Sequence, residues 1–173
     1  GAAGPTLQRE DDRARGRTRP PPARISAGLN PLLSAPVVYV PNGLLPEQIR
    51  FEKNNSSLYG RIAYMGTLGE ENGPDLVIEC IPTIEKSVPN VHLTIIGGYP
   101  SDISRLTTLA KKLGVGKKVS FHGFVQSPVA MSKILRSCYL AVAPYRAFPG
   151  SVRYFADAGK IRAYCAAGLP VVT

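Results

Sequence analysis

The sequence predicts an α/β fold in which a parallel sheet carries helices on both faces. From Val37 onward, short apolar runs alternate with segments of helical periodicity. Strands that alternate with helices of about ten to fifteen residues are typical of right-handed βαβ units and a parallel sheet. The chain of 173 residues also contains 17 glycines and 16 prolines, which indicates many turns between its elements.

The predicted elements follow one another in a regular series. We expect strands near Val37–Val40, Arg61–Met65, His92–Ile96, Lys118–Phe121, Tyr139–Ala143 and Pro170–Thr173. We expect helices at about Pro74–Ser87, Asp102–Leu113, Pro128–Ser137 and Asp157–Ala167. One domain therefore extends over residues 37–173, and residues 1–36, rich in Pro and Arg without an apolar face, form a disordered basic tail.

Local signals mark the ends of the first three helices. Pro82 lies inside the first helix and predicts a kink or an early end. Ser101 is the expected cap of the second helix, and Gly114 its stop. Ser127 is the expected cap of the third helix, with Pro128 at the first helical position, where a missing N–H costs nothing.

The last predicted helix carries one residue that helix stability does not explain. Asp157 can cap this helix and Gly168 can end it, while the apolar positions Ile161, Tyr164 and Cys165 face a core. Lys160 sits in the first turn, where a cation opposes the helix dipole at a cost of roughly 0.3–1 kcal/mol. A cation there suits an anion bound at the helix end; a solvated surface lysine is the alternative.

The net charge and the composition limit the classes of binding partner that the chain is expected to have. The formal net charge is +9, which favours phosphorylated sugars, an anionic membrane surface or nucleic acid. Nucleic acid ranks last because the sequence has no RNA-binding aromatic signature, zinc-finger spacing or basic helix. No apolar run approaches the roughly 18 residues of a membrane span, and the first residues lack the apolar region of a secretory signal.

The three cysteines are widely separated in the sequence. Cys80, Cys138 and Cys165 show no spacing typical of zinc or redox sites, and their number is odd. Each lies on an apolar stripe or at a strand edge. We therefore expect small core residues in a reducing compartment, and we expect no metal site.

Four loops after predicted strands are candidate binding sites. The loop Gly66–Gly73 could approach a phosphate, although it matches neither the dinucleotide nor the P-loop pattern, and a βα turn capped by Asn72 is the alternative. Gly97 and Gly98 could admit a nucleotide at the carboxyl edge of the sheet or form a simple turn. The loop Tyr145–Ala156 is long and rich in arginine.

Two further features belong to these loops. In Tyr145–Ala156, Arg146 and Arg153 could clamp a phosphate, or the loop could be merely mobile and solvated. The turn Gly123–Val125 follows a strand with His122 beside it, and we assign no chemistry to this histidine. No residue is assigned as catalytic.

An ordered series of motifs resembles the group 1 (family 4) glycosyltransferases. The segment Asp157–Val172 (DAGKIRAYCAAGLPVV) is similar to their C-terminal signature, and matching pieces precede it. These pieces are PNG at Pro41–Gly43, IAYMGTLGEENG at Ile62–Gly73, LTIIGG at Leu93–Gly98 and VSFHGFV at Val119–Val125. The resemblance covers about residues 37–173. It implies the GT-B architecture of two Rossmann-like halves, of which this chain would be the C-terminal half, truncated at its C-terminus.

The resemblance also implies a set of donor-binding residues. They are Gly66, Thr67, Asn72, Gly97, Gly98, Gly123, Phe124, Val125, Tyr145, Arg146, Arg153, Asp157, Lys160 and Tyr164. The family's two loop cations align with Thr67 and Asn72, and its paired glutamates align with Phe155 and Ala163. Lys160, Arg146 and Arg153 could replace the missing cations.

The resemblance thus implies a function in glycosyl transfer. The domain would bind the nucleotide diphosphate of a UDP- or GDP-sugar, without a further cofactor, for transfer to a glycan or lipid-linked acceptor in cell-envelope polysaccharide biosynthesis. The isolated chain is expected to be inactive. We also expect cytoplasmic residence with peripheral contact at the inner membrane face. A degenerate, noncatalytic binding or interaction module is the alternative, and another nucleotide-binding Rossmann-like enzyme is a weaker one.

Overall fold

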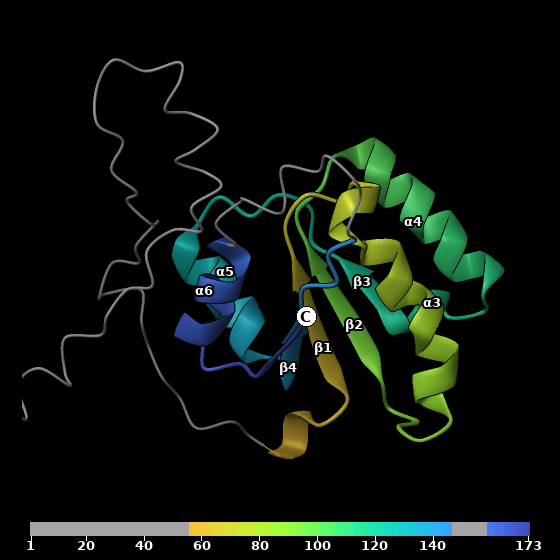
Figure 1. Ribbon diagram of the computed structural model, residues 1–173, viewed down its shortest axis with the longest axis horizontal. Coiled ribbons are helices and arrows are strands. Elements are labelled where there is room, and N and C mark those ends of the chain that lie inside the picture. Colours follow the sequence, from red (N-terminus) through yellow and green to blue (C-terminus); the bar gives the residue numbers. More distant parts are fainter. Residues whose placement is uncertain (1–55, 147–158) are drawn as a thin grey trace, which may run out of the picture. The chain divides into compact units, whose positions relative to one another are not determined.

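The computed structural model describes residues 56–146 and 159–173, which belong to one compact unit, Asn42–Thr173. The strands are β1 Arg61–Met65, β2 His92–Ile96, β3 Val119–Phe121, β4 Leu140–Val142 and β5 Val171–Val172. The helices are α3 Pro74–Glu85, α4 Pro100–Lys112, α5 Pro128–Arg136 and α6 Gly159–Ala166, with 3₁₀ turns η3 Ser56–Leu58, η4 Glu70–Asn72 and η5 Gly116–Lys118. The α/β prediction is confirmed (Figure 1); the strand predicted at Val37–Val40 lies outside the described residues.

The five strands form one parallel sheet in the order β3-β2-β1-β4-β5. The central strand β1 pairs with β2 on one side, where Arg61 lies opposite His92, and with β4 on the other, where Ile62 lies opposite Leu140. The sheet therefore grows outward from β1 in both directions. In open parallel sheets of this order, ligands bind beyond the carboxyl ends of the strands where the order reverses, which is here between β1 and β4.

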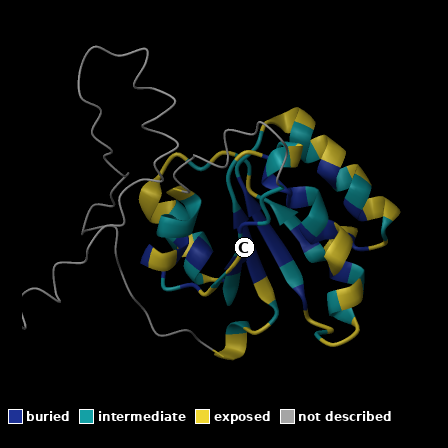
Figure 2. Cartoon of the chain, viewed as in Figure 1, coloured by how far each residue is buried: buried dark blue, intermediate teal, exposed yellow. Residues whose placement is uncertain are grey.

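Helices cover both faces of the sheet, as the sequence predicts (Figure 1). On one face, α3 and α4 pack on the strands through a cluster that includes Ile78, Ile81 and Leu106. On the other face, α5 and α6 bury Leu135 and Tyr164 against the sheet. The central strands β1 and β2 are mostly buried, whereas the outer faces of the helices are exposed (Figure 2). Continuous apolar strands are typical of sheets that are covered on both faces.

The predicted ends of α5, α4 and α6 are confirmed by their backbone geometry. The hydroxyl of Ser127 accepts the N–H of Ala130 at 3.3 Å, as an N-cap does. Gly114 and Gly168 both have positive φ, at 74° and 76°. Just beyond each glycine, an N–H bonds back to the last turn, from Val115 to Ala110 at 2.9 Å and from Leu169 to Tyr164 at 3.0 Å.

The structure differs from the predicted helices in two details. Ser101 does not cap α4, because the helix begins at Pro100 with Tyr99 as its N-cap. Proline fixes φ near the helical value, so it suits the first helical position better than the interior. In α3, Pro82 does not end the helix, which continues to Glu85, short of the predicted Ser87.

The prediction of three core cysteines is confirmed at one position only. Cys138 is buried, whereas Cys80 and Cys165 are exposed. Both exposed residues lie on helices whose neighbouring positions, Ile81 in α3 and Tyr164 in α6, already fill the side that faces the sheet. Within 56–146 and 159–173, no helix has the length and apolar content needed to cross a bilayer.

Candidate functional site

The loops that follow β1, β2 and β3 are joined by backbone hydrogen bonds at the carboxyl edge of the sheet. The N–H of Gly66 donates to Ile96 at 2.9 Å, and the N–H of Gly97 donates to Gly123 at 2.6 Å. These bonds continue the strand ladder by one residue. The N–H groups of Gly66 and Gly97 are therefore already engaged within the protein.

Glycine at this edge permits close contact between backbones. Gly97 has a φ of 108°, and a Cβ atom there would lie 2.4 Å from the carbonyl oxygen of Gly66. A Cβ on Gly98 would meet the side chain of Leu68 at 2.2 Å. The loops after β1 and β2 pack together only because these positions lack side chains. The two glycines therefore do more than form a simple turn, because they also allow the two loops to touch.

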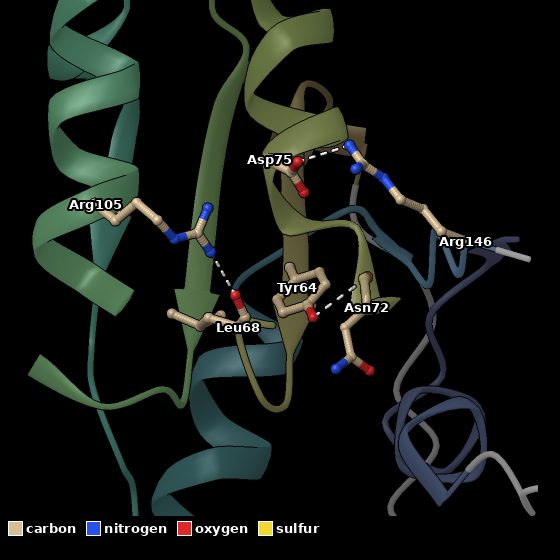
Figure 3. A network of polar contacts seen from close by, with 6 residues as sticks. All are labelled: Tyr64, Leu68, Asn72, Asp75, Arg105 and Arg146. Carbon is tan, nitrogen blue, oxygen red and sulfur yellow. Dashed lines mark hydrogen bonds and ion pairs between the residues drawn. The ribbon is translucent and has the colours of Figure 1, made fainter. Parts of the chain in front are cut away.

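Tyr64, near the end of β1, lies buried beneath the loops at the carboxyl edge. Its ring is fully buried, and its hydroxyl donates to the carbonyl oxygen of Thr67 at 2.7 Å. The carbonyl oxygen of Asn72 lies 3.4 Å from the same hydroxyl (Figure 3). The tyrosine thus holds both ends of the loop between β1 and α3, a role that the sequence patterns did not indicate.

Asn72 does not cap α3, contrary to one prediction. The N-cap is Gly73 in a left-handed conformation, and the side chain of Asn72 turns inward and is 1% exposed. Its amide nitrogen donates to the hydroxyl of Thr67 at 2.7 Å and to the carboxylate of Glu71 at 3.0 Å. The two positions that align with the family's loop cations are therefore hydrogen-bonded to each other.

Lys160, from the first turn of α6, extends over this same edge. Its ammonium nitrogen lies 3.4 Å from the side-chain oxygen of Asn72 and 3.5 Å from the hydroxyl of Tyr64. It also lies 4.7 Å from the ring centres of Tyr64 and Tyr145, a distance at which a cation is attracted to an aromatic face. A Cβ on Gly66 would come within 3.1 Å of it. The cation thus occupies the point between β1 and β4 where the sheet order reverses.

Arg146 has a charged partner within the protein. Its guanidinium forms a 2.6 Å ion pair with Asp75 in the first turn of α3 (Figure 3). Its backbone N–H donates to Glu71 at 3.1 Å, so the segment after β4 is fastened to the loop after β1 at two points. The charge of Arg146 is therefore compensated by a carboxylate that is itself largely buried.

Arg105 is a further anchor that the sequence analysis missed. From α4, its guanidinium donates to the carbonyl oxygen of Leu68 at 2.7 Å (Figure 3). Leu68 is fully buried beneath the helix. No local pattern could identify this contact, since the two residues are separated by 37 positions and the arginine lies on an otherwise polar helix face.

Tyr164 and Phe124, both predicted donor contacts, lie in opposite environments. Tyr164 is fully buried, and its hydroxyl oxygen accepts the N–H of Met65 at 2.6 Å, so its side chain ties α6 to the end of β1. Burial raises the pKa of this phenol above its ordinary value. Phe124, between Gly123 and Val125 in the turn after β3, is 80% exposed. Only the second is at the surface.

The structure brings together part of the predicted set. Gly66, Thr67, Asn72, Tyr145 and Lys160 meet between β1 and β4, and Gly97 and Gly123 adjoin them through backbone bonds. The predicted residues Arg153 and Asp157 lie outside the described residues, as does Phe155. In the parts of the chain that are described, no three His, Cys, Asp or Glu side chains gather as a metal site.

The sheet order and the helix-covered faces define a Rossmann-like α/β domain with a cation at its topological switch point. The family model described as "Glycosyl transferases group 1" matches residues 60–173. The chain belongs to this family. A search of curated protein sequences gave no match.

Solved structures of glycosyltransferases share the fold. WaaG, a glycosyltransferase involved in lipopolysaccharide biosynthesis, is 21% identical with a TM-score of 0.56 over 76% of this chain and 36% of its own. A TarM mutant from S. aureus, solved with UDP, is 13% identical with a TM-score of 0.58 over 84% of this chain and 27% of its own. The chain thus spans about a third of these relatives or less.

A third structure with the same fold is a single domain of a glycosyltransferase. The C-terminal domain of a group 1 family glycosyl transferase (LpcC) from Francisella tularensis is 17% identical, with a TM-score of 0.58. The match covers 75% of this chain and 69% of that domain. The described fold is therefore that of a C-terminal domain of the GT-B architecture. At these identities the likeness establishes the fold alone.

Proposed function

We propose that this domain binds the diphosphate of a nucleotide sugar and is the donor-binding half of a glycosyltransferase. The whole enzyme would pass the sugar to a glycan or lipid-linked acceptor of the cell envelope, at the cytoplasmic face of a membrane that it contacts peripherally. Membership of the group 1 family supports this proposal. UDP in the TarM complex supports a nucleotide donor.

The position of Lys160 is the observation that carries the proposal. Lys160 belongs to the first turn of α6. Its ammonium group lies where the sheet order reverses, between the carboxyl ends of β1 and β4. Backbone N–H groups at a helix start favour anions, and a cation beside them adds a charge-assisted contact. Stacking between two tyrosine rings holds the ammonium in place before a ligand arrives, which lowers the entropic cost of binding.

The same position suits the chemistry of glycosyl transfer. When the bond between sugar and diphosphate breaks, negative charge grows on the leaving diphosphate. A fixed cation beside that group stabilises the transition state more than the ground state. In this proposal Lys160 supplies that charge, Arg153 is a second candidate, and Arg146 positions the loop after β4 through its pair with Asp75.

Calorimetric titration with UDP and GDP tests the donor site. We expect binding in the micromolar range, on the order of −8 kcal/mol, and a loss of about tenfold or more in Lys160→Ala. The matched control is Lys133→Ala, which removes an exposed lysine of α5 and should leave the affinity unchanged. Equal binding by both variants would remove Lys160 from the site.

A noncatalytic module is the second candidate, and one observation favours it. Thr67 and Asn72, at the positions of the family's loop cations, carry no charge and bond to each other. Ala163 of α6 stands where a family glutamate is expected. No binding of either nucleotide or of their sugars by the folded wild-type chain would favour this candidate over the donor site.

A further inference from the structure

Carboxylates gather at the carboxyl edge of the sheet, together with Lys160 and Arg146, whereas the opposite edge is mainly basic. Most carboxylates of the described chain follow the carboxyl ends of strands: Glu70, Glu71, Asp75 and Asp102. Six cations at the opposite, amino edge make up what we call the amino-edge basic surface: Arg61, Lys86, Lys111, Lys112, Lys117 and Lys118. Lys133 and Arg136, in the last turn of α5, lie at the same edge on the other face of the sheet. Glu85 is the acid that accompanies the amino-edge basic surface, at the end of α3.

Strand pairing and side-chain contacts place Arg61, Lys118 and Lys86 at the same edge of the sheet. Arg61 begins β1 opposite His92, and Lys118 stands just before the start of β3, which pairs with β2. The ammonium of Lys118 lies 3.0 Å from the carboxylate of Glu85 and donates to the carbonyl of Pro89 at 2.8 Å. These bonds tie η5 to the end of α3, where Lys86 follows.

The end of α4 joins the same surface. A Cβ on Gly116 would lie 3.5 Å from the side chain of Lys111, so η5 packs on the last turn of α4. Lys86, Lys111, Lys112, Lys117 and Arg61 are all exposed. Because Glu85 is engaged by Lys118, the surface carries an excess of about five positive charges.

Helix dipoles account for only part of this excess. Lys111 and Lys112 lie in the last turn of α4, where cations are favourable. Lys117 lies in a 3₁₀ turn, and Arg61 opens a strand. The positive field also reaches His92, whose pKa is lowered mainly by burial and further by Arg61 and Lys118. Arg61 and Lys118, on two different elements, therefore act on the same imidazole.

We infer that the amino-edge basic surface binds an anionic phospholipid bilayer. Flexible lysines spread over several elements suit a diffuse anionic plane, and each basic residue near such a surface strengthens binding about fivefold. Single-stranded nucleic acid, whose binding proteins interleave aromatic rings with cations, is the competing ligand, because Tyr59, 53% exposed, packs on Tyr139 beside Arg61. This inference rests on the peripheral membrane contact proposed above, but it does not depend on the donor site at the other edge.

Co-sedimentation with vesicles tests the inference on the whole 173-residue chain. We expect binding to vesicles of phosphatidylcholine mixed with phosphatidylglycerol, little binding to phosphatidylcholine alone, and weaker binding as salt is raised. The variant with Lys86, Lys111, Lys112 and Lys117 all changed to Gln should bind roughly several hundredfold more weakly. The same four positions changed to Arg should retain binding.

A matched control removes four charges elsewhere, by changing Arg13, Arg15, Arg17 and Arg19 to Gln. If this control loses as much vesicle binding as the lysine variant, net charge rather than the amino-edge basic surface binds lipid, and the inference fails. It also fails if single-stranded RNA outcompetes the vesicles for the wild-type chain. Unchanged UDP affinity in the lysine variant separates this result from failure of the donor site.

Discussion

The ammonium nitrogen of Lys160 lies 3.4 Å from the side-chain oxygen of Asn72, across 88 positions of sequence. This contact joins α6 to the loop between β1 and α3. It places the cation proposed for a diphosphate beside the residue that stands where the family carries a loop cation. The positive charge at the carboxyl edge thus comes from α6 rather than from the loop between β1 and α3.

Asn72→Asp should weaken nucleotide binding. The substitution places a carboxylate beside Lys160 and opposes an incoming diphosphate, so we expect the affinity for UDP to fall about tenfold. Calorimetric titration at low salt measures the change. Asn72→Ala removes the same amide without adding charge, and a loss as large in this control would show that packing, not charge, is responsible.

Gly97→Ala should destabilise the fold. The new Cβ would lie 2.4 Å from the carbonyl oxygen of Gly66, and φ is 108°. Because backbone atoms must move, we expect a loss of about 2–4 kcal/mol in the free energy of unfolding, measured with urea.

Gly114→Ala is the matched control for this glycine. It also has positive φ, at 74°, but open space surrounds its Cβ position. Its expected cost is about 1–2 kcal/mol, from backbone conformation alone. Equal losses at Gly97 and Gly114 would contradict the close approach of the two loops.

Local patterns predicted what local interactions determine. Ser127 and Pro128 marked the start of α5 because a cap and a fixed φ act within a few residues. Asn72 was expected to cap α3 from the same kind of pattern, yet its side chain turns inward. There it forms hydrogen bonds with Thr67, Glu71 and Lys160, more than an N-cap would form. A contact with a residue distant in sequence, Lys160, thus helps to set the orientation of this side chain.

The candidate site was predictable to a similar degree. Lys160 was identified from its unfavourable place in a helix dipole, a local property. Its neighbours Tyr64 and Tyr145 could not be, because nothing local shows that β1 lies beside β4. Arg146 was identified as a cation, but its partner Asp75 is 71 positions away and changes what the arginine does.

Tyr164→Phe should destabilise the junction of α6 and β1. Loss of the hydroxyl leaves the N–H of Met65 without the acceptor that now lies at 2.6 Å. An unsatisfied buried donor costs about 1–3 kcal/mol, which urea unfolding would measure. Tyr99→Phe is the control, because Tyr99 is 73% exposed and its change should stay within about 0.5 kcal/mol. A neutral Tyr164→Phe would refute the anchoring role.

The three thiols should react at two different rates. Cys80 and Cys165 are exposed, whereas Cys138 is buried and burial raises the pKa of its thiol. A thiol reagent in native buffer should therefore label two cysteines rapidly and the third only on unfolding. Cys138→Ala should leave the rapid phase unchanged. Rapid labelling of all three would show that α5 and β4 do not shield this thiol.

Stability should fall on the acid side of neutrality because of His92. Burial, with Arg61 and Lys118 nearby, lowers the pKa of His92 in the folded chain. Below the unfolded value of about 6.5, the unfolded chain binds more protons than the folded one, so the free energy of unfolding decreases as pH falls. The decrease ends once the pH is below the folded-state pKa, and above about pH 7 the histidine contributes no slope.

The variant His92→Gln should remove this slope while keeping a polar group near Ser120, whose hydroxyl lies 3.1 Å from the ring. Urea unfolding at a series of pH values between about 5 and 8 measures it. His122→Gln is the control, since it leaves His92 in place and should retain the loss seen in the wild-type chain. If His92→Gln keeps the full acid-side slope, the positive field at the amino edge does not act through this histidine.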